Sequence, residues 1–169
     1  MPAQDVPRPY PLIDSDPHAG RVIRYMRSSD YGVWAGATAA GPGLLYLYEK
    51  VDPSKYRHGI NPALRLTTFL GFAAGFMLAY QQSSFRLWGL KENQAEVARD
   101  KVEMSALAKA GKPLYGETDM SDYLQGVAAR NSTWSQLKLH AMPWFNLVNH
   151  NQHGVDNSKY TSETSQQSS

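Results

Sequence analysis

The chain has 169 residues, 42% of them hydrophobic, and its 17 basic and 15 acidic residues leave a formal net charge of only +2. Because charges of both signs are scattered along the chain, it lacks the concentrated basic face that nucleic-acid binding requires, and no nucleic-acid partner is expected. The absence of cysteine excludes disulfides, thiolate metal sites, iron–sulfur clusters and a thiol nucleophile.

The chain begins with residues 1–17, which hold five prolines and predict an extended arm. Asp16 followed by Pro17 resembles a helix N-cap with proline at the first helical position. A short basic amphipathic helix is therefore expected over residues 18–30, with three arginines on one face: Arg21, Arg24 and Arg27. Such a helix suits a membrane surface, although a solvated helix packed on a soluble core would show the same pattern.

Two segments without charged residues follow, at residues 31–48 and 66–85. An α-helix rises about 1.5 Å per residue, so about 20 residues cross a hydrocarbon core of about 30 Å. We therefore predict transmembrane helices over residues 31–48 and 66–88, joined by a connecting loop over 49–65. The competing interpretation is two buried helices of a globular domain, but the chain has little other apolar sequence to bury them.

Glycines spaced four residues apart mark both predicted spans. In lipid the hydrophobic effect does not drive helices together, and small side chains instead let two backbones approach closely. Helix packing is therefore predicted at four glycines: Gly32, Gly36, Gly71 and Gly75. Pro42 is expected to kink the first span, because proline lacks the backbone N–H of a helical hydrogen bond.

Aromatic side chains gather near the ends of both spans, as is typical of the membrane–water interface. We assign this position to Trp34, Tyr46, Tyr48, Phe85 and Trp88. An even number of spans puts both ends of the chain on one side of the membrane. Lysine and arginine are divided too evenly between the loop and the flanks to say which side.

Residues 89–150 are predicted to form a peripheral helical region. A charged, alanine-rich helix is expected over residues 90–110, because Gly111 and Pro113 then terminate it. Asp119 and Asp122 resemble helix caps.

A further helix is expected to start near Thr133, where Thr133 and Gln136 resemble a capping box. Trp134, Leu137 and Ala141 would share its apolar face. Residues 151–169 are rich in Ser, Gln and Asn and are expected to be disordered.

The sequence holds no catalytic or cofactor-binding motif, neither a phosphate-binding glycine loop nor a dinucleotide fingerprint. His150 and His153 are close in sequence, but a closed metal site needs about four ligands. The remaining histidines, His18, His58 and His140, are expected at the surface. Apart from tyrosines, residues 31–48 and 66–85 have no ionisable side chain for a proton relay. We therefore predict no catalytic residue, no metal and no cofactor bound by this chain.

Two blocks of the sequence carry a family resemblance: "SSDYGVWAGATAAGPGLLYLYEKVDPSKYR" and "LTTFLGFAAGFMLAYQQSSFRLWGLKENQAEVARD". Together with the order of the regions around them, they resemble the fungal accessory subunit of mitochondrial respiratory complex I known as the 21-kDa type. The likeness extends over roughly residues 10 to 150, and it rests on the whole run rather than on one short motif.

The resemblance implies an all-α, multi-pass protein of the mitochondrial inner membrane within NADH:ubiquinone oxidoreductase. The expected fold is a two-helix transmembrane hairpin with an extended N-terminal arm and a partly helical, polar C-terminal region. The expected role is that of a non-catalytic accessory subunit that supports assembly and stability of the membrane arm, with other complex I subunits and membrane lipids as partners. The alternative is a subunit of a mitochondrial inner-membrane protein translocase, which also uses glycine-rich spans.

Overall fold

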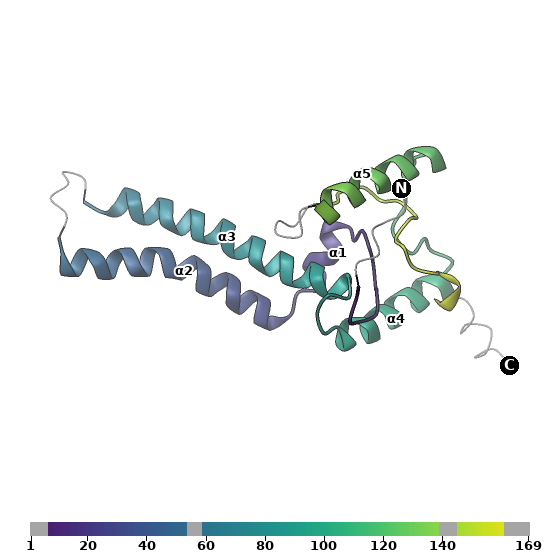
Figure 1. Ribbon diagram of the computed structural model, residues 1–169, viewed down its shortest axis with the longest axis horizontal. Coiled ribbons are helices and arrows are strands. Elements are labelled where there is room, and N and C mark those ends of the chain that lie inside the picture. The colour runs from purple at the N-terminus through teal and green to yellow at the C-terminus, as the bar shows by residue number, and fades with distance from the viewer. Residues whose placement is uncertain (1–6, 54–58, 139–144, 161–169) are drawn as a thin grey trace. The chain divides into compact units, whose positions relative to one another are not determined.

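The computed structural model describes residues 7–53, 59–138 and 145–160, and this part of the chain is all-helical (Figure 1). It contains helices α1 (Ala19–Arg24), α2 (Ser28–Val51), α3 (Asn61–Leu87), α4 (Gln94–Lys109) and α5 (Asp122–Lys138). No strand occurs in the described ranges, where His18 and Asn146 form an isolated parallel β-bridge. The predicted all-α class is confirmed.

The chain divides into two compact units. The first, which we call the discontinuous unit, combines residues 1–25 with residues 84–169. The second, the hairpin unit, consists of residues 26–83 and therefore lies within the sequence of the first. Each unit is described by itself below.

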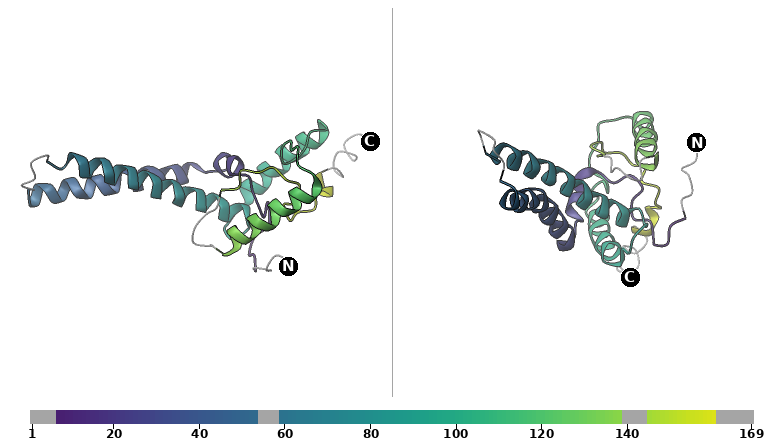
Figure 2. Two further views of the ribbon diagram at one scale, coloured as in Figure 1. Left: turned by 90° about the horizontal axis from the view of Figure 1, so that it is seen from above. Right: turned by 60° about the vertical axis from the view of Figure 1, so that its left-hand side comes forward.

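The hairpin unit is built from α2 and α3, which run side by side in both figures (Figures 1 and 2). The 24 residues of α2 and the 27 residues of α3 correspond to lengths of about 36 Å and about 40 Å. Asp30 helps to start α2, because its carboxylate accepts a hydrogen bond of 2.8 Å from the backbone N–H of Arg27. At the other end, Glu49 and Lys50 continue the helix to Val51, so the connection is shorter than the predicted loop over 49–65.

Of the helices in the described ranges, α3 is long and apolar enough to cross a membrane, with a mean hydropathy of 1.4 over its most apolar stretch. Helix α2 does not reach the same standard, although residues 31–48 carry no charge. Glycine, alanine and tyrosine, which are abundant in α2, contribute much less hydropathy than leucine or phenylalanine do. By length and composition, therefore, the described helices include one candidate membrane span, whereas the sequence predicted two.

The basic helix predicted over residues 18–30 is wrong in three respects. Helix α1 is only six residues long, and the chain leaves it before α2 begins at Ser28. His18 rather than Asp16 caps it, because His18 Nδ1 accepts a hydrogen bond of 3.1 Å from the N–H of Gly20. Arg21 is buried rather than displayed on a basic surface.

Helix α4 ends at Lys109, shortly before Gly111, whose φ of 65° is a left-handed conformation that suits glycine at a helix end. Helix α5 begins at Asp122, not near Thr133 as predicted. The proposed capping box and its apolar face, together with His58 and His140, fall outside the residues or side chains that the structure describes.

The predicted disorder of the C-terminal region is wrong for residues 151–160. His153 and Tyr160 are buried, with exposures of 4% and 3%. The backbone also takes part, because the carbonyl of His153 accepts a hydrogen bond of 3.0 Å from the N–H of Ser15. Residues 161–169 lie outside the described part.

Candidate functional site

A buried arginine organises the polar interior of the discontinuous unit. Arg21 donates from Nη1 to Asp14 Oδ2 at 2.6 Å and pairs through Nη2 with Asp100 of α4. Burial by itself lowers the pKa of Arg21, but the carboxylates of Asp14 and Asp100 outweigh it and raise that pKa above its ordinary value. The guanidinium is therefore a fixed positive charge that holds the N-terminal arm against α4.

Asp100 receives a second partner from the far end of the chain. The hydroxyl of Tyr160 donates to Asp100 Oδ2 at 2.6 Å. Burial raises the pKa of Asp100, although the Tyr160 hydroxyl and Arg21 both work in the opposite direction. Burial and the carboxylate also raise the pKa of Tyr160 above its ordinary value, so its hydroxyl stays a donor.

Two histidines extend this network. His153 Nδ1 lies 2.7 Å from Asp14 Oδ1, and His150 Nε2 lies 2.7 Å from Asp16 Oδ2. The two imidazole rings stack with centroids 4.6 Å apart, and the Tyr115 ring stacks on His153 at 3.7 Å. Within the ranges that the structure describes, no three or more His, Asp or Glu side chains gather in a way that could hold a metal ion.

The network joins segments that are far apart in sequence, and its groups are already engaged with one another. Asp16, for example, also accepts a hydrogen bond of 2.5 Å from the hydroxyl of Ser132 in α5. Each of these shared carboxylates links separate segments, so the network stabilises the fold of the unit. Sequence reasoning missed this network, and the one local signal was an aromatic residue, Tyr160, in an otherwise polar tail.

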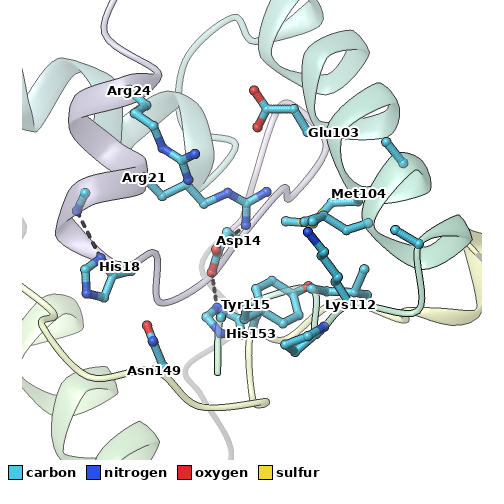
Figure 3. Close-up of a pocket in the computed structure, with 17 residues that line it drawn as sticks. Asp14, His18, Arg21, Arg24, Glu103, Met104, Lys112, Tyr115, Asn149 and His153 are labelled. Atoms are coloured by element: carbon cyan, nitrogen blue, oxygen red, sulfur yellow. Dashed lines mark hydrogen bonds and ion pairs between the residues drawn. The ribbon is translucent and has the colours of Figure 1, made fainter. Parts of the chain in front are cut away.

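A cavity of about 900 Å³ lies beside the network, between α1 and the C-terminal end of α4 (Figure 3). Its wall includes charged side chains of both signs and apolar side chains from α4 and the segment that follows. Arg24 enters it from α1 and Lys112 from the segment after α4 (Figure 3).

The hairpin unit has a different kind of interface, in which backbones nearly touch. A Cβ atom on Gly71 would lie 2.7 Å from the carbonyl oxygen of Ala37, and one on Gly75 would lie 2.7 Å from that of Trp34. Both distances are shorter than real Cβ contacts. Gly71 and Gly75 therefore lie where α3 packs on α2, while a Cβ on Gly32 or Gly36 would point into space that the rest of the described chain leaves open.

The aromatic residues assigned to a membrane interface occupy several environments. Trp34 packs inside the hairpin, where its Nε1–H donates to the carbonyl of Phe72 at 3.0 Å. Tyr46 and Tyr48 are 52% and 64% exposed. Phe85 contacts Trp88, which is buried, with ring centroids 5.8 Å apart. Their place at a membrane interface stays a prediction.

The fold and these sites define a class of protein: an all-helical chain with an exposed apolar hairpin, joined to a unit that buried ion pairs hold together. A surface of that kind is normally covered by lipid or by other chains. Residues 7–92 match the family described as "NADH-ubiquinone oxidoreductase complex I, 21 kDa subunit", and residues 101–168 match the C-terminal region of the same 21 kDa subunit. The chain belongs to this family.

A relative supports the same assignment. The chain is 54% identical over 152 residues to the NADH-ubiquinone oxidoreductase 20.9 kDa subunit of Neurospora crassa, over 89% of this chain and 80% of the relative. The resemblance found in the sequence is thereby confirmed. So is the expectation of an accessory, non-catalytic subunit of complex I.

Proposed function

We propose that the hairpin unit crosses the mitochondrial inner membrane twice and that the chain supports assembly and stability of the membrane arm of complex I. The observation that carries this proposal is the apolar surface of both helices. Large hydrophobic side chains are exposed along α2 and α3, among them Leu44, Leu47, Leu66, Phe69 and Leu70. Water would make such a surface costly, whereas lipid tails and apolar helices would cover it.

The length and pairing of α2 support its inclusion as a span. Its 24 residues exceed the roughly 20 that a bilayer requires, and residues 31–48 carry no charged side chain. The close backbone contact at Gly71 and Gly75 is the packing that membrane helices use in place of hydrophobic burial. The low hydropathy of α2 follows from its many glycine and alanine residues.

Partners follow from the same surface. Gly32 and Gly36 leave open space on α2, which suits a helix of a neighbouring subunit that approaches as closely as α3 does. Lipid tails would cover the larger apolar side chains. The chain is proposed to bind no metal and no redox cofactor itself. No observation favours the alternative of a translocase subunit.

Three single-cysteine chains test the topology, since the natural chain has no cysteine. Pro9→Cys, Asp52→Cys and Ser158→Cys place a thiol before α2, between the two helices and after α3. Each chain is labelled with a membrane-impermeant maleimide in intact mitoplasts and again after detergent. Two spans require Pro9→Cys and Ser158→Cys to label from the same side and Asp52→Cys from the other. If Pro9→Cys and Asp52→Cys share a side, α3 alone crosses.

Native electrophoresis tests the role in assembly. Depletion of the chain should lower the amount of complete complex I, and the full chain should restore it. A chain lacking residues 26–83 should not restore it, because those residues form the hairpin unit. An undiminished complex after depletion would refute the role in assembly and stability.

A further inference from the structure

The cavity beside α1 has two cations without an ion-pair partner in the described part of the chain. The guanidinium of Arg24 and the ammonium of Lys112 form no ion pair or side-chain hydrogen bond among the residues that the structure describes. Both groups project into the space between α1 and the end of α4 (Figure 3). They come from different segments, so the fold brings them to one cavity.

The acidic groups of the cavity wall are already engaged by other partners. Asp14 is held by Arg21 and His153. Glu103 accepts hydrogen bonds of 2.8 Å from Arg99 Nε and from the hydroxyl of Tyr25. Although burial acts to raise the pKa of Glu103, those two bonds outweigh it and lower the pKa, with Arg24 contributing. The positive charge left over in the cavity therefore belongs to Arg24 and Lys112.

An apolar wall lies next to these cations. Met104 and Leu107 contribute from α4, and Pro113 and Leu114 from the segment after it. A ligand that satisfies the whole cavity needs a negative charge for the cations and hydrocarbon for this wall. An acidic peptide is a poorer fit, because its backbone N–H and C=O groups would face apolar side chains without partners.

We propose that this cavity binds an anionic phospholipid, with the phosphate held by Arg24 and Lys112 and the first part of the acyl chains against Leu107 and Leu114. Arginine holds phosphate with two parallel hydrogen bonds, and lysine adds a point charge. The choice of a lipid rests in part on the proposed function. Arg24 precedes Ser28, the first residue of α2, by four positions, so a spanning hairpin would bring Arg24 to the level of the headgroups.

The binding test uses the full chain in a neutral detergent and isothermal titration calorimetry with short-chain lipids. Dihexanoyl phosphatidylglycerol should bind at one molecule per chain. Dihexanoyl phosphatidylcholine, which has no net charge, should bind at least about fivefold more weakly. Inorganic phosphate in excess should not displace the lipid. Equal affinity for both lipids, displacement by phosphate alone, or no binding of phosphatidylglycerol would overturn the proposal.

Four variants test whether lipid binding depends on this cavity or only on the overall charge of the chain. Arg24→Ala and Lys112→Ala should each weaken phosphatidylglycerol binding about fivefold. Lys109→Ala removes the same charge from a residue of α4 that does not line the cavity, so its affinity should match that of the natural chain. Leu107→Gln should also weaken binding, because it makes the apolar wall polar. Equal losses in Lys109→Ala and Lys112→Ala would overturn the proposal.

A competing peptide tests whether the partner at this cavity is a protein rather than a lipid. A glutamate-rich peptide that displaces phosphatidylglycerol, with an equal dependence on Lys112, would assign the cavity to a protein and overturn the lipid proposal. The topology and assembly experiments do not involve this cavity. Suppose that the cysteines label as two spans require and the complex assembles normally, but the chain binds no phosphatidylglycerol. This inference would then be refuted and the proposed function would stand.

Discussion

His153 Nδ1 lies 2.7 Å from Asp14 Oδ1, although the two residues are 139 positions apart. The same carboxylate accepts hydrogen bonds from Arg21 at 2.6 Å and from the backbone N–H of Asp16 at 3.0 Å. One buried side chain thus joins the N-terminal arm, α1 and the C-terminal region. Asp14 is therefore a point where three separate segments of the discontinuous unit meet.

Asp14→Ala should therefore destabilise the discontinuous unit by about 1–3 kcal/mol, because the buried Arg21 keeps only Asp100 as an ion-pair partner and His153 loses its acceptor. Denaturant unfolding of the full chain in detergent, followed by circular dichroism, measures the change. Asp156→Ala removes an exposed carboxylate of the same region and should leave the midpoint unchanged. A loss below about 1 kcal/mol for Asp14→Ala, the size of an exposed pair, would show that the network matters little.

Shortening the chain tests the contribution of residues 151–160. A chain ending at residue 150 loses both His153 and Tyr160, so Asp14 and Asp100 each lose a partner. It should unfold at a lower denaturant concentration than the full chain. A chain ending at residue 160 keeps every contact described above and should unfold with the full chain. Identical midpoints for the two truncations would contradict the placement of these residues.

Disulfide formation tests the packing of α2 on α3. A Cβ atom on Gly41 would lie 3.4 Å from Thr67 Cβ, close to the range of about 3.5–4.5 Å found in disulfides. Gly41→Cys combined with Thr67→Cys should cross-link on mild oxidation in a chain that has no other cysteine. Gly43→Cys with Thr67→Cys is the control, because a Cβ on Gly43 has no neighbour within 4 Å. Equal yields for both pairs would contradict the helix register.

The four predicted packing glycines fall into two that contact the other helix of the hairpin and two that do not. Gly75→Leu should force α3 away from α2, because even a Cβ would approach the Trp34 carbonyl to 2.7 Å. Gly36→Leu adds the same side chain where the described chain leaves open space. In the Gly41/Thr67 cysteine background, Gly75→Leu should lower the disulfide yield and Gly36→Leu should not. A loss of complex I assembly in Gly36→Leu alone would identify that face as a contact with another subunit.

Alkaline pH should weaken the contact between α1 and α4. Burial, together with the hydrogen bond to Glu103, raises the pKa of Tyr25 from 10.0 to about 12. The folded state therefore favours the neutral phenol, and this stabilisation is complete below pH 10 and is lost as the pH rises through about 12. Tyrosinate absorbance of the natural chain minus that of Tyr25→Phe should show this midpoint. A difference titration centred at pH 10 would contradict the burial.

The helices that were predictable from sequence are those with a local signal. The charge-free runs of α2 and α3 and the glycine after α4 each act within a few residues. The start of α3 at Asn61 was not predicted, because residues 61–65 were assigned to the connecting loop. The start of α5 was missed, because the Thr133 pattern resembled a cap inside what is one continuous helix.

The polar network left no such signal. Arg21 and Asp100 are 79 residues apart, and Asp100 and Tyr160 are 60 apart, so no periodicity within one element relates them. The polar composition of residues 151–160 predicted disorder, but a few buried side chains such as Tyr160 hold this segment in the fold. The cavity combines Arg24 with Lys112, and only the folded chain brings these two together.

The division of the chain also sets the order in which the protein can be made. The hairpin contacts join residues such as Trp34 and Gly75, which are both synthesised in the first half of the chain. Asp14 and Arg21 leave the ribosome before the hairpin does, but their partners His153 and Tyr160 leave it after the hairpin. The discontinuous unit can therefore close only after the whole hairpin and residues up to 160 have been made. A chain stalled before residue 153 would lack the His153 partner of Asp14 and the Tyr160 partner of Asp100, which leaves this unit incomplete and open to proteolysis.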